Sequence, residues 1–118
     1  MLKQLHRFHS RNGVRAVLHK GAHKSVGPFK VSVLPTRKHQ DPPVAAVVVS
    51  KKVMKTAVGR NRIRRRVFSA LERVWEELHQ DSPLQVVVVC YEKELLDMPS
   101  EALYRDLHAA AIHAKERL

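Results

Sequence analysis

A run of basic side chains near the middle of the chain carries its clearest chemistry. The segment Lys51 to Arg66 reads KKVMKTAVGRNRIRRR and holds eight lysines and arginines but no acidic residue. A guanidinium is a planar fork of donors that matches phosphate oxygens, and the amide of Asn61 can donate to and accept from a base edge or a ribose. The segment is therefore a candidate for binding a folded RNA or a nucleic-acid duplex.

Basic runs of this kind are more often a solvated helix face or a nuclear localisation signal. Two features of this run favour binding instead. No acidic residues flank it to compensate its charge, and it opens a helical pattern rather than a polar tail.

The distribution of charge supports the same interpretation. The chain has 118 residues with 22 Lys and Arg against 11 Asp and Glu, a formal net charge of +11. Residues 1–66 hold 17 of the basic residues and a single acid, whereas residues 67–118 hold five basic residues and ten acids. Such asymmetry favours a polyanionic partner bound through the first half, and nucleic acid is the leading candidate.

A long amphipathic helix is predicted to position the basic run. Thr56 can serve as its N-cap, and the helix should extend to about His79. At one hundred degrees per residue one face is apolar and most of the arginines fall opposite it. The apolar set is Ile63, Val67, Ala70, Leu71, Val74 and Leu78, and the opposite set is Arg62, Arg65, Arg66 and Arg73. Arg60 lies in the first turn and can project past the helix end, while Arg64 lies on the flank.

The other predicted elements complete an α/β layer domain. A basic tail over residues 1–9, which we expect to be flexible, precedes a short helix that begins at Ser10 or Asn12 and ends at Lys20-Gly21, where glycine suits a left-handed end. Further predictions are a loop over 23–27, a strand over 29–33, a hairpin loop over 37–43, a strand over 44–49 buried on both faces, a strand over 84–91, and a last helix capped by Ser100. The strand over 44–49, the long helix and the strand over 84–91 would form a βαβ unit. We expect one domain over residues 1–118.

Other chemistry finds little support in the sequence. The eight histidines lack the clear four-ligand spacing of structural zinc, and the sequence contains no nucleophile elbow, P-loop or H-E-x-x-H motif. We therefore expect no catalytic residue and no metal ligand in this chain. The single cysteine, Cys90, is predicted to be a buried small hydrophobe, which fits a reducing cytoplasm. No apolar run is long enough to span a membrane and no secretory signal precedes the fold, although the Arg- and His-rich start leaves an organellar transit peptide as an alternative.

The segment Val47 to Val67 closely resembles the signature of the protein subunit of bacterial ribonuclease P. In that family a strand leads into Ser-Lys-Lys, and Ala-Val-x-Arg-Asn-Arg-x-Lys/Arg-Arg opens a long helix. The matching residues here are Ser50, Lys51, Lys52, Ala57, Val58, Arg60, Asn61, Arg62, Arg64 and Arg65. The resemblance extends in outline over nearly the whole chain.

The resemblance implies a concrete function and fold. A large RNA subunit would catalyse with bound Mg²⁺, removing the 5′ leader from precursor tRNA in the bacterial cytoplasm. The protein would bind one RNA subunit and the leader, broaden substrate specificity, and hold no cofactor of its own. The family fold is an α+β two-layer sandwich with a left-handed βαβ crossover, contrary to the usual rule. The RNA-subunit-binding residues would be Lys51, Lys52, Arg60, Asn61, Arg62, Arg64, Arg65 and Arg66.

The chain departs from the family where the leader should bind. Family members commonly place aromatic residues on the first helix and the facing strand, where this chain has Val14, Leu18 and Ser32. Stacking on an aromatic contributes roughly 1–3 kcal/mol per base, so these replacements should weaken or reshape leader recognition. The candidate cleft residues are Val14, Arg15, Leu18, Phe29, Lys30 and Ser32, although Val14, Leu18 and Phe29 could instead be core.

Two other functions fit the charge pattern. A structural RNA-binding protein, similar to a ribosomal protein, would share the asymmetry without affecting leader cleavage. A DNA-binding module would place the arginine helix in a major groove and prefer duplex DNA to structured RNA at matched salt.

Overall fold

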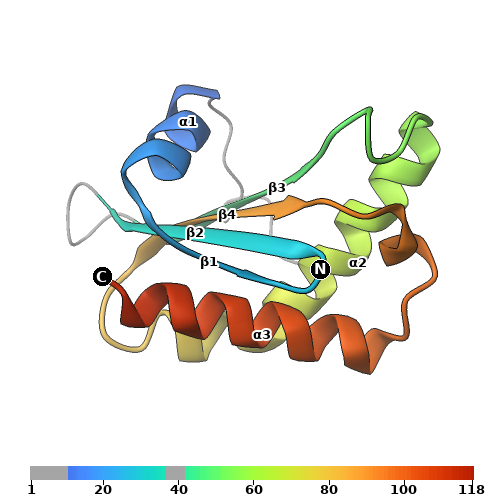
Figure 1. The fold of residues 1–118 in the computed structure, drawn as a ribbon. Helices are drawn as coiled ribbons and strands as arrows, with labels where there is room; N and C mark the ends of the chain where they lie inside the picture. The colour runs from blue at the N-terminus through green and yellow to red at the C-terminus, as the bar shows by residue number, and fades with distance from the viewer. Residues whose placement is uncertain (1–10, 37–41) are drawn as a thin grey trace.

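Three α-helices and a four-stranded mixed sheet form the fold (Figure 1). The computed structural model describes residues 11–36 and 42–118, so the predicted basic tail and most of the predicted loop over 37–43 lie outside the described residues. The elements run α1 (Arg11–Lys20), β1 (Ala22–Val26), β2 (Phe29–Pro35), β3 (Val44–Val49), α2 (Ala57–Leu78), β4 (Leu84–Cys90), the 3-10 helix η2 (Lys93–Leu96) and α3 (Ser100–Glu116). The α+β class is as predicted.

The sheet has the order β1-β2-β4-β3, in which β4 is central. Strand β4 pairs antiparallel with β2 and parallel with β3, so β3, α2 and β4 form the expected βαβ unit. The handedness of this crossover stays a prediction. Because β4 separates β2 from β3, the segment over 37–43 does not join paired neighbours, and the predicted hairpin there is wrong.

Two strand predictions also need correction. Strand β3 is an edge strand that alternates between half-buried and buried residues, not a central strand buried on both faces. Residues 22–26, which fall mostly in the predicted loop over 23–27, form β1 and pair with β2 from Ala22 opposite Val33 to Val26 opposite Phe29. Gly27 turns this hairpin with a φ of 55°, a left-handed conformation that glycine adopts without steric cost.

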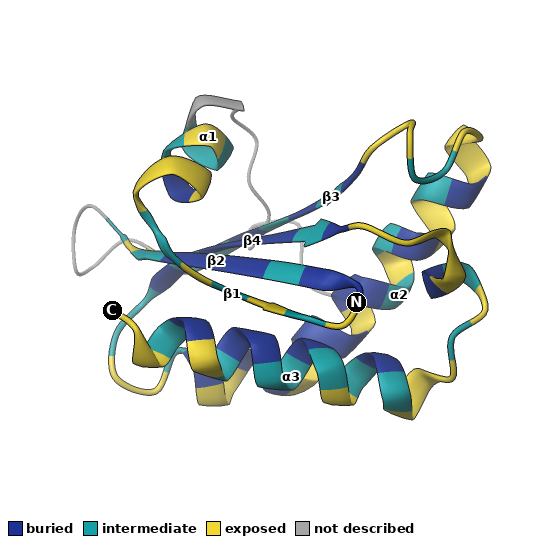
Figure 2. Cartoon of the chain, in the orientation of Figure 1, coloured by how far each residue is buried: buried dark blue, intermediate teal, exposed yellow. Residues whose placement is uncertain are grey.

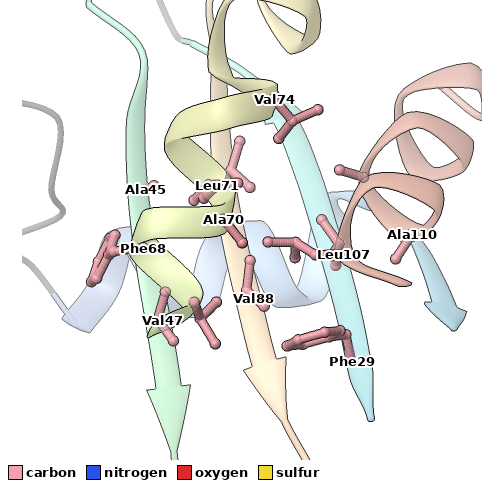
Figure 3. Close-up of a cluster of buried hydrophobic side chains, with 14 of the residues drawn as sticks. Phe29, Ala45, Val47, Phe68, Ala70, Leu71, Val74, Val88, Leu107 and Ala110 are labelled. Carbon is pink, nitrogen blue, oxygen red and sulfur yellow. The ribbon is translucent and has the colours of Figure 1, made fainter. Parts of the chain in front are cut away.

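Helices α2 and α3 cover one face of the sheet, and their apolar sides form the main core (Figures 1 and 3). The six apolar residues predicted for the inner face of α2 are all buried. Helix α3 buries the five residues predicted to face the core, Leu103, Leu107, Ala110, Ala111 and Ala114. Ser100 is its first helical residue rather than its cap, since Pro99 occupies the N-cap position without a side-chain hydrogen bond.

Helix α1 lies on the opposite face of the sheet, against β2 and β4 (Figure 1). Val17 of this helix and Val87 of β4 are fully buried but do not belong to the main core cluster. Gly21 ends α1 without a positive φ, so the predicted left-handed end is wrong. Glycine suits this position because a Cβ there would lie 2.5 Å from the Val17 carbonyl oxygen and 2.6 Å from that of Val33.

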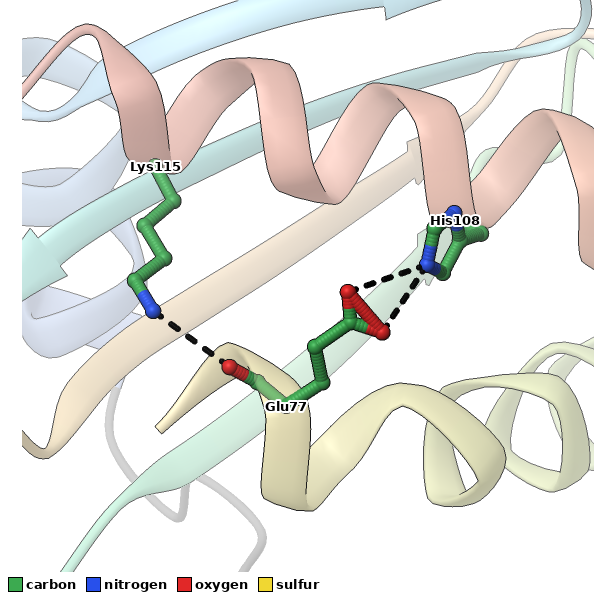
Figure 4. A network of polar contacts seen from close by, with 3 residues as sticks. All are labelled: Glu77, His108 and Lys115. Carbon is green, nitrogen blue, oxygen red and sulfur yellow. Dashed lines mark hydrogen bonds and ion pairs between the residues drawn. The ribbon is translucent and has the colours of Figure 1, made fainter. Parts of the chain in front are cut away.

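Polar contacts tie the C-terminal end of α2 to α3 (Figure 4). The His108 Nε2 atom lies 3.0 Å from Glu77 Oε1, and the Lys115 ammonium donates to the Glu77 carbonyl at 3.3 Å. The Lys115 ammonium also lies 3.3 Å from an Asp81 carboxylate oxygen. Because the carboxylates of Glu77 and Asp81 are 50% and 84% exposed, the contribution of each pair to stability is about 1 kcal/mol or less.

Candidate nucleic-acid interface

The basic segment begins in a hydrogen-bonded turn at the end of β3. The backbone N–H groups of Val53 and Met54 both donate to the Ser50 carbonyl at 3.1 Å. This turn leaves the side chains of Lys51 and Lys52 exposed. The loop is therefore an ordered platform that presents two ammonium groups beside the start of α2.

Thr56 caps α2 as predicted. Its side-chain oxygen accepts a hydrogen bond from the Gly59 N–H at 3.1 Å, and its own backbone is extended. The first turn nevertheless contains no acidic residue. Because the N-terminal end of a helix carries partial positive charge, arginines there are electrostatically unfavourable for the isolated protein, and an anionic partner would relieve this cost.

The exposed part of the segment covers the outside of this helix start and the loop before it (Figure 2). Its members are five exposed basic residues and one exposed asparagine: Lys51, Lys52, Lys55, Arg62, Arg65 and Asn61. We call this set the basic surface. Its side chains project from a hydrogen-bonded loop and a regular helix, which can fix the register of contacts with a phosphate backbone.

Two arginines of the segment are instead turned back onto the protein. The Arg60 guanidinium donates to the carbonyls of Met54 and Lys55 at 3.0 and 2.9 Å, so it projects past the helix end as predicted. The Arg66 guanidinium donates to the carbonyls of Leu95 and Met98, between η2 and α3. Both are half-buried. These two arginines hold the surroundings of the basic surface in place rather than forming its exposed part.

Arg64 occupies an intermediate position on the flank of α2. Its guanidinium donates to the side-chain oxygen of Asn61. It also lies near Cys90, which is buried as predicted. Burial raises the pKa of the Cys90 thiol to about 12, and the positive charge of Arg64 opposes that rise.

The basic surface does not continue along α2 beyond the segment. Arg73 pairs with Glu101 of α3 at 3.2 Å, and its guanidinium stacks on the Tyr104 ring at 3.8 Å from the centroid. Next to this pair, α2 and α3 line a half-open pocket of about 230 Å³ to which Arg66 and Ser69 also contribute. The charge of Arg73 is therefore already matched within the protein.

The predicted leader cleft falls on the sheet face that α1 partly covers. Val14 and Lys30 are half-buried, Arg15 is exposed, and Leu18 is 36% exposed, so parts of all four are accessible to a ligand. Ser32 is 0% exposed, and its hydroxyl has no hydrogen-bond partner among the described residues. It therefore lies beneath this surface.

Phe29 does not belong to this face, and its assignment to the cleft is wrong. It is 0% exposed and belongs to the main core cluster, together with Val88 and Leu107 (Figure 3). Strand side chains alternate between the two faces of the sheet. Phe29, Val31 and Val33 therefore point toward α2 and α3. Lys30 and Ser32 point toward α1. No aromatic residue from the predicted cleft set remains on the α1 side.

Sequence reasoning missed one exposed aromatic residue. Tyr91 follows the last residue of β4, where we predicted a continuing buried strand, and its side chain is 53% exposed. The alternation of β4 could have predicted this exposure. Cys90 faces the core, so the next residue, Tyr91, should face away from it.

Residues 11–36 and 42–118 contain neither a metal-binding cluster nor a membrane-spanning helix. No group of three or more His, Cys, Asp or Glu side chains is arranged to hold a metal ion. No helix in this part of the chain combines the length and apolar character needed to cross a membrane.

Comparison with known proteins identifies the family. The family model for ribonuclease P matches residues 2–115. The chain belongs to the ribonuclease P protein family. The Staphylococcus aureus RNase P protein structure superposes with a TM-score of 0.72 at 20% identity, covering 93% of this chain and 95% of that one. The Thermotoga maritima RNase P protein gives a TM-score of 0.71 at 16% identity, covering 95% and 96%. No curated protein sequence matches the chain.

Family membership confirms the resemblance carried by the central motif. Proteins of the ribonuclease P family are components of an endoribonuclease complex of protein and RNA that acts in tRNA processing. The structural matches, at these identities, establish the fold of three helices and a four-stranded mixed sheet.

Proposed function

We propose that this chain is the protein subunit of a ribonucleoprotein that removes the 5′ leader from precursor tRNA in the bacterial cytoplasm. The observation that carries the proposal is the basic surface, which occupies an acid-free helix start on the fold of this family. One protein would bind one RNA subunit, with the protein binding RNA and the RNA performing the cleavage.

The basic surface is the proposed docking site for the RNA subunit. Guanidinium forks of Arg62 and Arg65 suit bidentate contacts with phosphates of a folded RNA, while Lys51 and Lys52 add point charges. Each phosphate neutralised releases counterions, so binding should weaken steeply as salt rises. Asn61 adds an amide that can donate to and accept from a ribose or a base edge.

The face beside α1 is the proposed path of the leader. Arg15 and Lys30 can hold leader phosphates, and the accessible parts of Val14 and Leu18 offer apolar contact. With Phe29 in the core, this face lacks the aromatic stacking that the family resemblance implies. We therefore expect weaker or altered leader recognition on this face.

The chain's part in the reaction is to bind and orient RNA. Mg²⁺, which we expect the RNA subunit to hold, would supply a metal-activated water for hydrolysis of the phosphodiester bond. The protein would neutralise phosphates on both RNA partners, so that the folded assembly forms at lower concentrations of Mg²⁺.

The test is reconstitution with a bacterial ribonuclease P RNA at low Mg²⁺, following cleavage of a precursor tRNA. The wild-type protein should restore cleavage, and the quadruple variant Lys51→Ala, Lys52→Ala, Arg62→Ala and Arg65→Ala should not. Arg105→Ala is the matched control, because Arg105 is an exposed arginine on α3 outside the basic surface.

Tight RNA binding without stimulation of cleavage, repeated with several types of RNA subunit, would contradict the proposal. That result would move the chain to the structural RNA-binding class.

A further inference from the structure

Among residues 11–36 and 42–118, Tyr91 is the one exposed side chain of the Phe, Trp and Tyr type. Its backbone N–H donates to the Pro28 carbonyl at 2.9 Å, which holds the residue at the end of β4. A single exposed apolar group needs no explanation by itself, so its surroundings decide whether it marks a site.

The surroundings of Tyr91 form an open hollow of about 670 Å³. Its lining residues come from the loop after β3 and from the segment between β4 and η2: Lys52, Val53, Tyr91, Glu92, Lys93 and Glu94. Strands β3 and β4 are parallel neighbours that end together, with Val49 opposite Cys90, so these two segments meet at one end of the sheet (Figure 1). Ligands of open α/β sheets commonly bind outside the carboxyl ends of the strands.

The charges of this hollow argue against a free anion as its ligand. Two ammonium groups, from Lys52 and Lys93, are balanced by the carboxylates of Glu92 and Glu94. A phosphate alone would gain from the first pair and be repelled by the second. The hollow offers an aromatic ring, carboxylates and ammonium groups. All three would be used by a ligand that joins a flat ring, hydrogen-bond donors on that ring and a phosphate.

A nucleotide has this combination of parts. Unpaired bases stack on tyrosine rings, and carboxylates accept hydrogen bonds from exocyclic amino groups on base edges. Guanine, adenine and cytosine carry such an amino group, whereas uracil lacks one and offers only its ring N3–H, between two carbonyl oxygens that a carboxylate would repel.

We propose that the hollow binds one unpaired nucleotide of the leader, with its base on Tyr91 and its phosphate at Lys93, which lies outside the basic surface. Glu92 or Glu94 would accept from the amino group of the base and disfavour uracil at that position. The assignment rests on the proposed function, in which the leader is the single-stranded partner, and it places an aromatic contact outside the cleft residues predicted from the sequence.

The first experiment measures the affinity of the reconstituted holoenzyme for precursor tRNA and for mature tRNA. Stacking of one base corresponds to about a 5- to 150-fold change in affinity. We expect Tyr91→Ala to weaken precursor binding within that range and to leave mature tRNA binding unchanged. Tyr91→Phe should restore precursor binding because it keeps the ring, while Tyr91→Leu should not, although it fills similar space.

The second experiment tests the carboxylates with a set of precursors that carry each base at each leader position. One position should disfavour uracil by several fold. In the double variant Glu92→Gln and Glu94→Gln that discrimination should shrink, because an amide can turn to donate to the uracil carbonyl. A preference that is unchanged in this variant would remove the carboxylates from the assignment.

The affinity for the RNA subunit alone separates failure of this inference from failure of the proposed function. If the wild-type protein binds no ribonuclease P RNA and stimulates no cleavage, the proposed function fails. If it does both, and Tyr91→Ala matches wild type with precursor tRNA or weakens only RNA-subunit binding, the leader assignment is overturned.

Discussion

Four of the five arginines of the basic segment divide into two groups that differ in what their guanidinium groups contact, while Arg64 is intermediate. Arg60 and Arg66 donate to backbone carbonyls of the chain itself, whereas Arg62 and Arg65 extend into solvent. The four lie within two turns of one helix. Arg60 and Arg66 stabilise the loop before α2 and the turn before α3. Arg62 and Arg65 stay exposed for a ligand. One basic motif therefore supplies both the contacts that hold the binding surface in place and the charges of that surface.

The largest expected effect is on affinity for the RNA subunit, and its salt dependence should distinguish the exposed arginines from Arg60 and Arg66. Replacing both Arg62 and Arg65 by Ala should weaken binding to the RNA subunit about 100-fold, or about 3 kcal/mol, because each removes a charge-assisted contact. The slope of log affinity against log salt should fall by about one unit per arginine. Titrations at several salt concentrations provide the measurement, with Arg105→Ala as the control.

Arg60→Ala provides the contrast in the same titrations. It should lower affinity by loosening the loop over 50–56 while leaving the slope unchanged, since its guanidinium contacts carbonyls rather than phosphates. Equal losses of slope in Arg60→Ala and Arg62→Ala would show that the two groups do not differ.

A smaller effect is expected on folding when Arg66 is changed. Arg66→Ala should lower the free energy of unfolding by about 2 kcal/mol, because two carbonyls lose a charged donor. This corresponds to a fall in Tm of roughly 8 °C for a domain of this size, measured by thermal unfolding. Arg66→Lys keeps the charge but lacks the fork, so it should recover only part of the loss. A variant as stable as wild type would contradict the supporting role of Arg66.

The smallest effect concerns the buried thiol of Cys90, the last residue of β4, which lies near Arg64. The pKa of Cys90 is raised from 9.0 to about 12, so between these values the unfolded chain binds fewer protons at this group than the folded protein. Stability from the neutral thiol is therefore complete below pH 9 and declines as pH rises, by about 1.4 kcal/mol at pH 10. Urea unfolding at pH 8 and pH 10 measures it, and Cys90→Ala should remove this component of the pH dependence.

Most of α2 could be predicted from the sequence because its determinants are local. The Thr56 cap, the apolar face beginning at Ile63 and the end near His79 all depend on neighbours within a few residues. The family motif lies within the same stretch. The motif led to the proposed function through a resemblance rather than through geometry.

The remaining features depend on partners distant in the chain. Strand β1 carries His23, Lys24 and Ser25, which give no apolar alternation, and its strand conformation follows from pairing with β2. Residues Val44–Val49 are apolar throughout, so nothing local distinguishes an edge strand from a central one. The contacts of Arg66 join residues 29 and 32 positions apart, and only the folded chain brings them together.

The central place of β4 has a consequence for how the protein is made. Within residues 11–36 and 42–118, strand β3 pairs only with β4, which is synthesised after α2. During translation the arginine segment therefore leaves the ribosome before the surface on which α2 packs is complete. Pairing between β2 and β4 also joins residues 49 to 61 positions apart, from Pro35 with Leu84 to Phe29 with Cys90, a non-local contact of the kind that slows folding. The nascent chain thus carries its basic segment before the sheet that positions α2 is complete.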